Sequence, residues 1–245
     1  LNDIFEDAQN RALLKNTPGA YLGSCRIKLP DSDSDTDMYE RIFEVFKKND
    51  VDKFIYIGGN DSMDTVDKLS RYAKEHNIDI AVVGAPKTID NDLAGTDHTP
   101  GFGSAARFVA STVKEVARDS GVYAEKSITI IEIMGRNAGW LTASSALARS
   151  ENSTAPHLIY LPERPVSREK IIGDIKNCKE NNIIIAVSEG IKDENGEYYC
   201  AQATQSHDIF GHAQLAGCAK VLEKFLGDEF GYKMRSVELS VLQRC

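Results

Sequence analysis

Apolar positions along the chain follow two patterns: short continuous runs, and faces that recur every three or four residues. The continuous runs predict buried strands at 54–57, 78–85, 128–133, 158–161, 183–187 and 232–239. Helical spacing predicts helices at 38–49, 62–77, 101–120, 167–181 and 213–226, with one more opening after 139. The resulting alternation of strand and helix favours a parallel, doubly wound α/β architecture.

Polar residues gather directly after several of these predicted strands. Asp61, Asp90, Arg136 and Glu189 each lie just past the end of one. Because the carboxyl ends of parallel strands share one edge of a sheet, ligands of open α/β sheets bind there. Unrelated surface loops would have no reason to coincide in this way. The pattern therefore predicts that these side chains contribute to one site.

Composition narrows the class of protein. The chain has 245 residues, enough for two lobes, and its 37 acidic and 29 basic residues give a formal charge of −8. No basic cluster suggests a nucleic-acid surface, and no apolar run is long enough to span a membrane. Five scattered cysteines without a CxxC motif favour a reducing cytoplasm over disulfides or zinc. The ends, Leu1 and Cys245, favour an incomplete chain.

The segment 86–92, Pro-Lys-Thr-Ile-Asp-Asn-Asp, carries the richest chemistry. It offers the ammonium of Lys87, the hydroxyl of Thr88, and the carboxylates of Asp90 and Asp92. Phosphoryl transfer needs such a set: a base for a hydroxyl, a cation for the phosphoryl charge, and an acid for metal or orientation. A polar turn with an aspartate helix cap is the alternative interpretation.

Three further motifs follow predicted strands. The segment 58–62, Gly-Gly-Asn-Asp-Ser, joins a strand to a helix, where backbone N–H groups and the helix dipole favour an anion. Arg136, after Met134 and Gly135, can bind a phosphate through two hydrogen bonds. Glu189, within 188–190, can accept hydrogen bonds from sugar hydroxyls. Taken alone, these motifs are also compatible with a tight turn, an ion pair and a turn, respectively.

Together with Arg235, Leu239, Gln243 and Arg244, these motifs occur in the order seen in phosphofructokinases, and the resemblance spans about residue 17 to the end. It implies two Rossmann-like lobes with the active site in the cleft between them. Residues 1–102 would form the lobe that binds the phosphoryl donor, and residues 103–245 the lobe that binds fructose 6-phosphate. The family's first glycine-rich loop and the last part of the sugar-phosphate lobe would be absent.

The resemblance also implies roles for individual residues. Asp90 would take the proton from the sugar 1-hydroxyl. The catalytic group would be Asp90, Lys87, Asp61, Thr88 and Asp92. The sugar-phosphate group would be Thr88, Asp90, Met134, Gly135, Arg136, Glu189, Arg235 and Arg244. The donor group would be Arg26, Gly58, Gly59, Asn60 and Asp61. The implied cofactor is Mg²⁺, and Asn60 stands where the family usually has an aspartate that helps hold it.

Two departures from the family pattern concern the phosphoryl donor. Asp61 and Lys87 replace glycines that ATP-using members usually have, as in the pyrophosphate-dependent branch. A carboxylate at 61 would repel a nucleotide α-phosphate, and Lys87 would offset charge on a pyrophosphate leaving group. An ATP-dependent member is the first alternative. A noncatalytic regulatory subunit is the second, although such a subunit would be expected to lose the base, and Asp90 is retained.

The closing motif and the subunit contacts also differ from the family. Ser240, Val241 and Cys245 stand where glycine, histidine and glycine are usual. In ATP-dependent relatives a neighbouring subunit supplies arginines to the site, and Ser127 occupies one of those positions, beside Lys126. The resemblance nevertheless implies a homo-oligomer whose ligands are fructose 6-phosphate and pyrophosphate or ATP, without nucleic acid or membrane.

Overall fold

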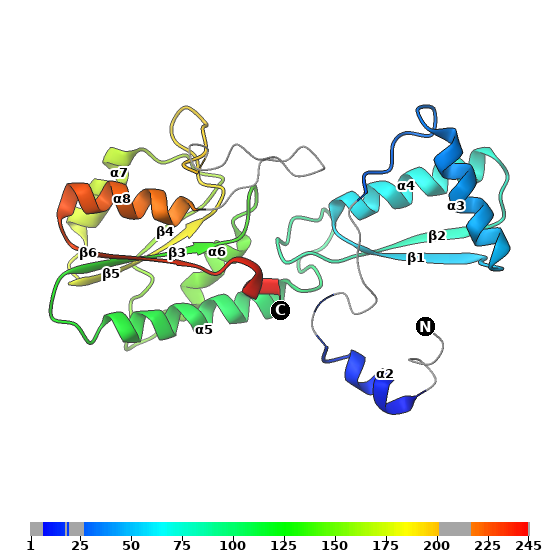
Figure 1. Ribbon diagram of the computed structural model, residues 1–245. Helices are drawn as coiled ribbons and strands as arrows, with labels where there is room; N and C mark the ends of the chain where they lie inside the picture. The colour runs from blue at the N-terminus through cyan, green and yellow to red at the C-terminus, as the bar shows by residue number, and fades with distance from the viewer. Residues whose placement is uncertain (1–6, 18, 20–26, 201–216, 245) are drawn as a thin grey trace.

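The computed structural model describes residues 7–17, 19, 27–200 and 217–244. They form two lobes, each built on its own parallel sheet (Figure 1). A short helix, α2 (Ala8–Leu14), has no buried residue and lies beside the smaller lobe. Among the described helices, none combines the length and the apolar content needed to cross a membrane.

The smaller lobe contains β1 (Lys53–Gly58) and β2 (Ala81–Pro86), paired in parallel. Helices α3 (Thr36–Lys48) and α4 (Asn60–Glu75) cover one face of this sheet. Their contact surface is aromatic, with Tyr39, Phe43 and Tyr72 buried against Phe54. The opposite face is uncovered by any described residue, so Ile55 and Ile57 are 65% and 68% exposed.

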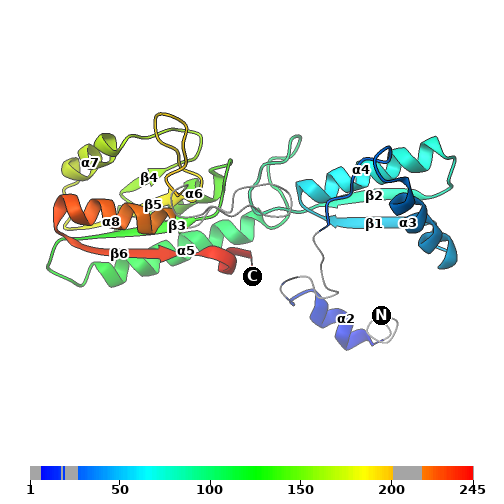
Figure 2. The same cartoon turned by 45° about the horizontal axis from the view of Figure 1, so that its top comes forward.

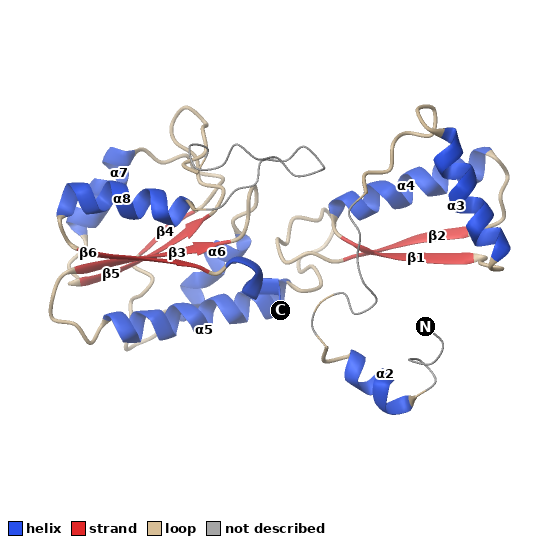
Figure 3. Ribbon diagram, viewed as in Figure 1, coloured by secondary structure: helices blue, strands red, loops and turns tan. Residues whose placement is uncertain are grey.

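The larger lobe contains β3 (Ser127–Ile133), β4 (Leu158–Tyr160), β5 (Asn182–Ser188) and β6 (Lys233–Glu238), in the spatial order β4-β5-β3-β6. All pairs are parallel (Figure 3). Helices α5 (Phe102–Ser120) and α6 (Trp140–Ser144), with the 3₁₀ turn η1 (Ser145–Ala148), lie on one face. Helices α7 (Arg168–Asn177) and α8 (Cys218–Phe230) cover the other face (Figure 2). A second 3₁₀ turn, η2 (Ser240–Arg244), follows β6.

Burial on both faces explains why the strands of the larger lobe read as continuous apolar runs. Every residue of β3 is buried, and so are all residues of β5 except the first. One layer of apolar side chains packs under α7 and α8, and the other packs against α5 and α6. The predicted doubly wound α/β fold is therefore confirmed in this lobe, whereas the described part of the smaller lobe has helices on one face only.

The predicted strands are all present, but some element ends differ from the sequence expectation. The run 78–85 starts earlier than β2, because Ile78 and Ile80 pack into the aromatic cluster before the strand begins at Ala81. The helix predicted over 167–181 ends at Asn177, where Cys178 becomes extended. The helix predicted over 213–226 is described from Cys218 to Phe230, and residues 213–216 lie outside the described part.

Candidate active site

The loop 87–101 links β2 to α5 and crosses between the two lobes (Figure 1). Its backbone is held by Asn91, which is buried and adopts a left-handed φ of 58°. The Asn91 side chain donates to the Asp97 carbonyl at 3.0 Å and accepts the Thr99 N–H at 2.9 Å. The Thr99 hydroxyl donates to the Thr88 carbonyl at 2.6 Å. Sequence reasoning missed this scaffold, although asparagine is a residue type that tolerates left-handed backbone.

Asp90 sits within this braced loop. Its N–H donates to the Thr88 hydroxyl at 3.1 Å. Burial raises the pKa of the Asp90 carboxyl, the charge of Asp92 raises it further, and Thr88, Arg136 and Lys87 oppose the shift. Arg136 belongs to the larger lobe, so Asp90 senses charges from both sides of the site. A carboxylate whose pKa is moved toward neutrality is suited to general base catalysis.

The donor-side motif lies against this loop. The Lys87 N–H donates to the Gly58 carbonyl at 2.8 Å, and the Asn60 amide donates to Asp92 Oδ2 at 3.0 Å. Gly58 is required by close packing, because a Cβ there would lie 2.0 Å from Ser62 Oγ. The first turn of α4 thus begins beside the loop that carries Asp90.

The N-terminus of α4 leaves backbone donors for an anion. Gly59 is its N-cap and supplies no side-chain hydrogen bond to the first turn. Asp61 lies in that first turn and is exposed, as is Lys87. Two glycines, an uncapped helix start and a nearby lysine form a surface suited to phosphate groups, with the Asp61 carboxylate as the exception.

On the larger lobe, the segment 134–136 and Glu189 meet at the ends of β3 and β5. Gly135 has a φ of 134°, and its N–H donates to Glu189 Oε1 at 3.3 Å. Gly190 permits close approach of the two segments, because a Cβ there would lie 1.9 Å from the Arg136 carbonyl oxygen. Arg136 Nε is buried and has no hydrogen-bond partner among the described residues. An unpaired guanidinium N–H of this kind fits an anionic or hydroxyl-bearing ligand.

The Glu189 carboxyl has an unusual protonation equilibrium. Burial raises its pKa to about 7, and the Gly135 N–H opposes that shift. The charges of Glu132 and Asp90 raise the pKa further, and that of Arg136 lowers it. Near neutral pH, Glu189 therefore exists in both protonation states.

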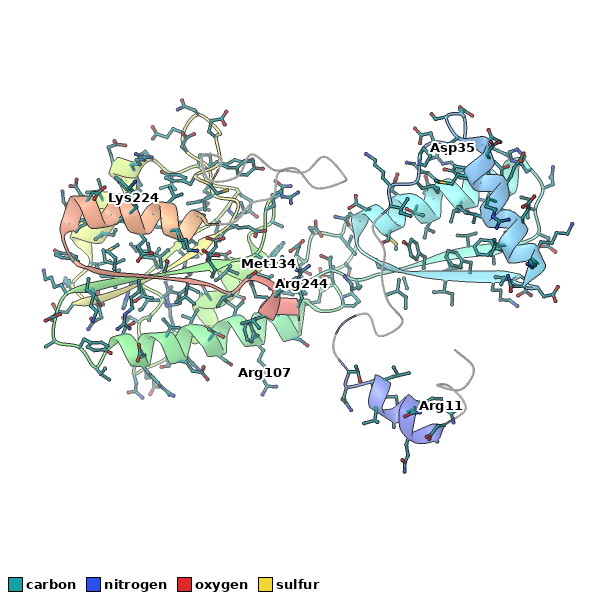
Figure 4. The ribbon with its side chains drawn as sticks, viewed as in Figure 1. Arg11, Asp35, Arg107, Met134, Lys224 and Arg244 are labelled. Carbon is teal, nitrogen blue, oxygen red and sulfur yellow. The ribbon has the colours of Figure 1, made fainter. Side chains whose placement is uncertain are left out.

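The turn η2 brings the end of the described chain to the same edge. Gln243 is 2% exposed, accepts the Met134 N–H through Oε1 at 3.2 Å, and donates to the Ser240 carbonyl at 3.1 Å. Arg244 follows it and is exposed, and Figure 4 shows Arg244 and Met134 near each other. Like Asn91, Gln243 holds the backbone of the site in place. From sequence it was recognised only as part of the motif around Arg235 and Arg244.

Arg235 is not brought to this edge within the chain. It is aligned with Thr129 near the start of β3, whereas Glu189 lies beyond the end of β5. Its guanidinium donates to Asp119 Oδ2 at 2.8 Å and lies 4.9 Å from the centre of the Tyr123 ring. Its position early in β6 places it at the opposite end of the sheet. Arg26, expected on the donor side, lies outside the described residues.

The residues present fit Mg²⁺ held jointly with substrate phosphates. Asp90 and Asp92 are carboxylates two residues apart, and Asn60 contacts Asp92 through its amide nitrogen, leaving its oxygen available. The described residues contain no cluster of three or more histidine, cysteine, aspartate or glutamate side chains that would hold a metal alone. Mg²⁺ is commonly bound by one or two carboxylates plus phosphate oxygens, which matches this donor set.

Comparison with known proteins identifies a family and several relatives. The sequence model described as Phosphofructokinase matches residues 4–238. A pyrophosphate–fructose 6-phosphate 1-phosphotransferase from Xanthomonas campestris is 43% identical over 98% of this chain and 58% of its own length. One from Halomonas elongata is 37% identical over 100% of this chain and 59% of its own length.

A solved structure agrees with these relatives. The pyrophosphate-dependent phosphofructokinase from Marinobacter aquaeolei matches with a TM-score of 0.79 and 34% identity. The match covers 97% of this chain and 54% of that chain. The present chain therefore spans somewhat more than half the length of the relatives it matches.

Proposed function

The chain belongs to the phosphofructokinase family, and from that premise we propose that it transfers a phosphoryl group from pyrophosphate to the 1-hydroxyl of fructose 6-phosphate. Its products are fructose 1,6-bisphosphate and phosphate. The observation that carries this proposal is the position of Asp90. This half-buried base with a raised pKa lies beside Lys87 and Asp92 and senses the charge of Arg136 in the other lobe.

The residues divide the reaction between the lobes. Asp90 accepts the proton of the sugar 1-hydroxyl as that oxygen attacks the terminal phosphorus of pyrophosphate. The bond from that phosphorus to the bridging oxygen breaks, and Lys87 offsets the charge on the departing phosphate. Thr88 positions Asp90 through the N–H that it accepts. When bound, Mg²⁺ supplies further neutralisation of phosphoryl charge.

Ligand positioning follows the same division. Segment 134–136, Glu189 and Arg244 hold fructose 6-phosphate, with the unpaired Arg136 Nε as one donor and Glu189 as acceptor for hydroxyls. Gly58, Gly59 and Asn60 at the start of α4 receive pyrophosphate through backbone N–H groups. Holding both ligands in line with Asp90 supplies much of the catalytic effect, because phosphoryl transfer depends mainly on position and charge.

Arg235 lies at the far end of the sheet from the other sugar-phosphate residues. This location is consistent with a contribution of Arg235 to the site of a neighbouring subunit in a homo-oligomer rather than to the site of its own chain. The scattered cysteines without a CxxC motif favour a reducing, cytoplasmic compartment.

The phosphoryl donor is assigned through Asp61. Its exposed carboxylate lies in the first turn of α4, just past the glycines that would receive the donor. Pyrophosphate ends before this point, whereas ATP would place its α-phosphate beside a like charge. We expect wild-type protein to prefer pyrophosphate. Asp61→Gly should shift the kcat/KM ratio toward ATP by about tenfold, equivalent to about 1.4 kcal/mol.

The measurement is kcat/KM for both donors at constant Mg²⁺. Asp67→Gly is the matched control, because Asp67 is another exposed aspartate on α4, paired only with Arg71. Its donor ratio should stay at the wild-type value. A wild type that prefers ATP would refute the donor assignment, and one that turns over neither donor would favour a regulatory subunit. An unchanged ratio in Asp61→Gly would remove Asp61 as the discriminating residue.

A further inference from the structure

Carboxylates crowd one face of the larger sheet at its carboxyl edge. Glu132 on β3 is in register with Glu238 on β6 and with Val187 on β5. Glu189 lies two residues beyond Val187, and its N–H continues the ladder by donating to the Ile133 carbonyl at 2.9 Å. Because side chains alternate along strands, Glu132 and Glu189 are diagonal neighbours on the same face.

Glu132 is held by the start of α8. Its Oε1 accepts the Gly217 N–H at 3.1 Å and its Oε2 accepts the Ala219 N–H at 2.7 Å. The side chain is buried, with 6% of its surface exposed. Both oxygens thus serve as acceptors at the positive end of a thirteen-residue helix, which favours the ionised form. The Glu189 carboxylate is held less firmly, because within the described part of the chain it accepts a single N–H, from Gly135 at 3.3 Å.

The remaining charged groups around the pair come from four elements. Burial, the largest effect, raises the pKa of Glu132 above its ordinary value, and the Glu238 charge adds to that shift. The N–H groups of Ala219 and Gly217 and the Lys220 charge oppose it. Around Glu189, Asp90 raises the pKa and Arg136 lowers it, again after burial. Burial holds the pKa of the Cys218 thiol on α8 well above its ordinary value, and the charges of Glu132 and Glu189 add to that shift. When one of two interacting carboxyls carries the charge, the other retains its proton more strongly.

We propose that Glu132, clamped to the N-terminus of α8, is a positioning residue that holds the negative charge of the pair and leaves the proton on Glu189. This inference rests on the proposed function, in which Glu189 accepts hydrogen bonds from the sugar. Glu132 itself does not touch the ligand. It makes sugar-phosphate binding respond to pH near neutrality.

The direction of the pH effect follows from the raised pKa of Glu189. Below a pH of about 7 Glu189 is protonated and loses acceptor strength, so fructose 6-phosphate binds more weakly as pH falls. Removing the charge of Glu132 lowers the pKa of Glu189. Glu132→Gln therefore retains binding at lower pH than wild type does.

The test is the pH dependence of the dissociation constant for fructose 6-phosphate, measured by calorimetry. Each constant is divided by its own value at about pH 8. At about pH 6, Glu132→Gln should show about a three- to tenfold smaller weakening than wild type, because one pKa unit corresponds to tenfold. Asp35→Asn is the matched control, since Asp35 also accepts an N–H at a helix start, at 3.1 Å from Met38. It lies in the smaller lobe (Figure 4), and its pH profile should match wild type.

A second measurement follows the ionisation of the carboxyls themselves and needs no ligand. Carboxyl ¹³C NMR of the protein labelled at glutamate should show that Glu132 ionises at a lower pH than Glu189, and that Glu132→Gln moves the Glu189 titration to lower pH. If wild type binds no fructose 6-phosphate, the proposed function fails while this titration still decides the coupling. Ionisation of Glu189 at a lower pH than Glu132, or an unchanged pH profile in a folded Glu132→Gln, overturns the inference.

Discussion

At the scale of single residues, Asp90 has the most demanding role because it must be ionised to accept a proton yet basic enough to hold it. Burial and Asp92 raise its pKa, so the working form is lost as pH falls through that value. Asp90→Asn keeps the shape and removes the basicity. We expect kcat to fall by about 10²- to 10⁴-fold while fructose 6-phosphate binding is retained.

Steady-state kinetics and calorimetry measure the two quantities separately. Asp97→Asn is the matched control, because Asp97 is exposed in the same loop and contributes only its backbone carbonyl to the scaffold. Its kcat should remain within about twofold of wild type, as is usual for surface substitutions away from structural features. Turnover near the wild-type rate in Asp90→Asn would exclude Asp90 as the base.

Residue types at strand ends could be recognised from sequence, whereas their partners could not. Asp90, Arg136 and Glu189 were predicted because each is a polar residue a few positions past the end of an apolar run. The burial of Gln243 against Met134 joins residues 109 positions apart, and the clamp on Glu132 joins residues 85 and 87 apart. Local patterns carry no signal for such pairs. The position of Arg235 was missed for a related reason, since its depth along β6 depends on register.

At the scale of elements, the site depends on how closely two segments approach. Gly190 lies against the backbone of Arg136, and a Cβ at 190 would meet that carbonyl oxygen at 1.9 Å. Gly190→Ala must therefore displace the segment that binds the sugar phosphate. We expect KM for fructose 6-phosphate to rise by about tenfold, and stability to fall by about 1–3 kcal/mol from overpacking.

Denaturant unfolding and steady-state kinetics test this expectation. Gly173→Ala is the matched control, since Gly173 lies inside α7 and a Cβ there meets nothing within 4 Å. That change should stabilise the protein by up to about 1 kcal/mol, because alanine is favoured over glycine in helices. A Gly190→Ala protein with wild-type KM would show that close approach at this point is unnecessary for binding.

Apolar patterns predicted the elements better than their ends. The runs at 128–133 and 183–187 coincide with β3 and β5, because strands buried on both faces contain few polar positions. Ends depended on tertiary contacts instead. Ile78 and Ile80 extend an apolar run into the connection before β2 because they fill the aromatic cluster of α3 and α4. The hydrogen-bonded scaffold of loop 87–101 likewise has no periodic signal.

At the scale of the whole molecule, Arg235 allows a test of assembly. If Arg235 serves a neighbouring subunit, each active site takes Asp90 from one chain and Arg235 from the next. Asp90→Asn and Arg235→Ala then remove contributions that different chains make to the same site. We expect each variant alone to have low turnover, and co-expressed variants to form mixed oligomers with clearly higher turnover. The gain arises because one site then receives an intact Asp90 from one chain and an intact Arg235 from its neighbour.

Co-expression of Asp90→Asn with Arg136→Ala provides the control. Both residues serve their own chain, so every mixed site retains one defect and no gain is expected. Light scattering on the wild type gives the oligomeric state. A fully active monomer, or equal turnover in the two mixtures, would contradict the role of Arg235 across a subunit boundary.

The two-lobe arrangement was expected from the resemblance. The single shared sheet edge expected from strand order was wrong, because Asp61 and Asp90 follow strands of the smaller sheet, whereas Arg136 and Glu189 follow strands of the larger one. What neither supplied was the route of the chain between the lobes. The proposed base lies on that route, in loop 87–101, rather than on either sheet. Because Asn60 and Gly58 bind this loop to the smaller lobe, a change in the angle between the lobes moves Asp90 relative to the sugar phosphate on the larger lobe. Opening of the lobes would then release the products and move the base away from the sugar site at the same time. An open molecule would therefore exchange ligands without transferring a phosphoryl group from pyrophosphate to water.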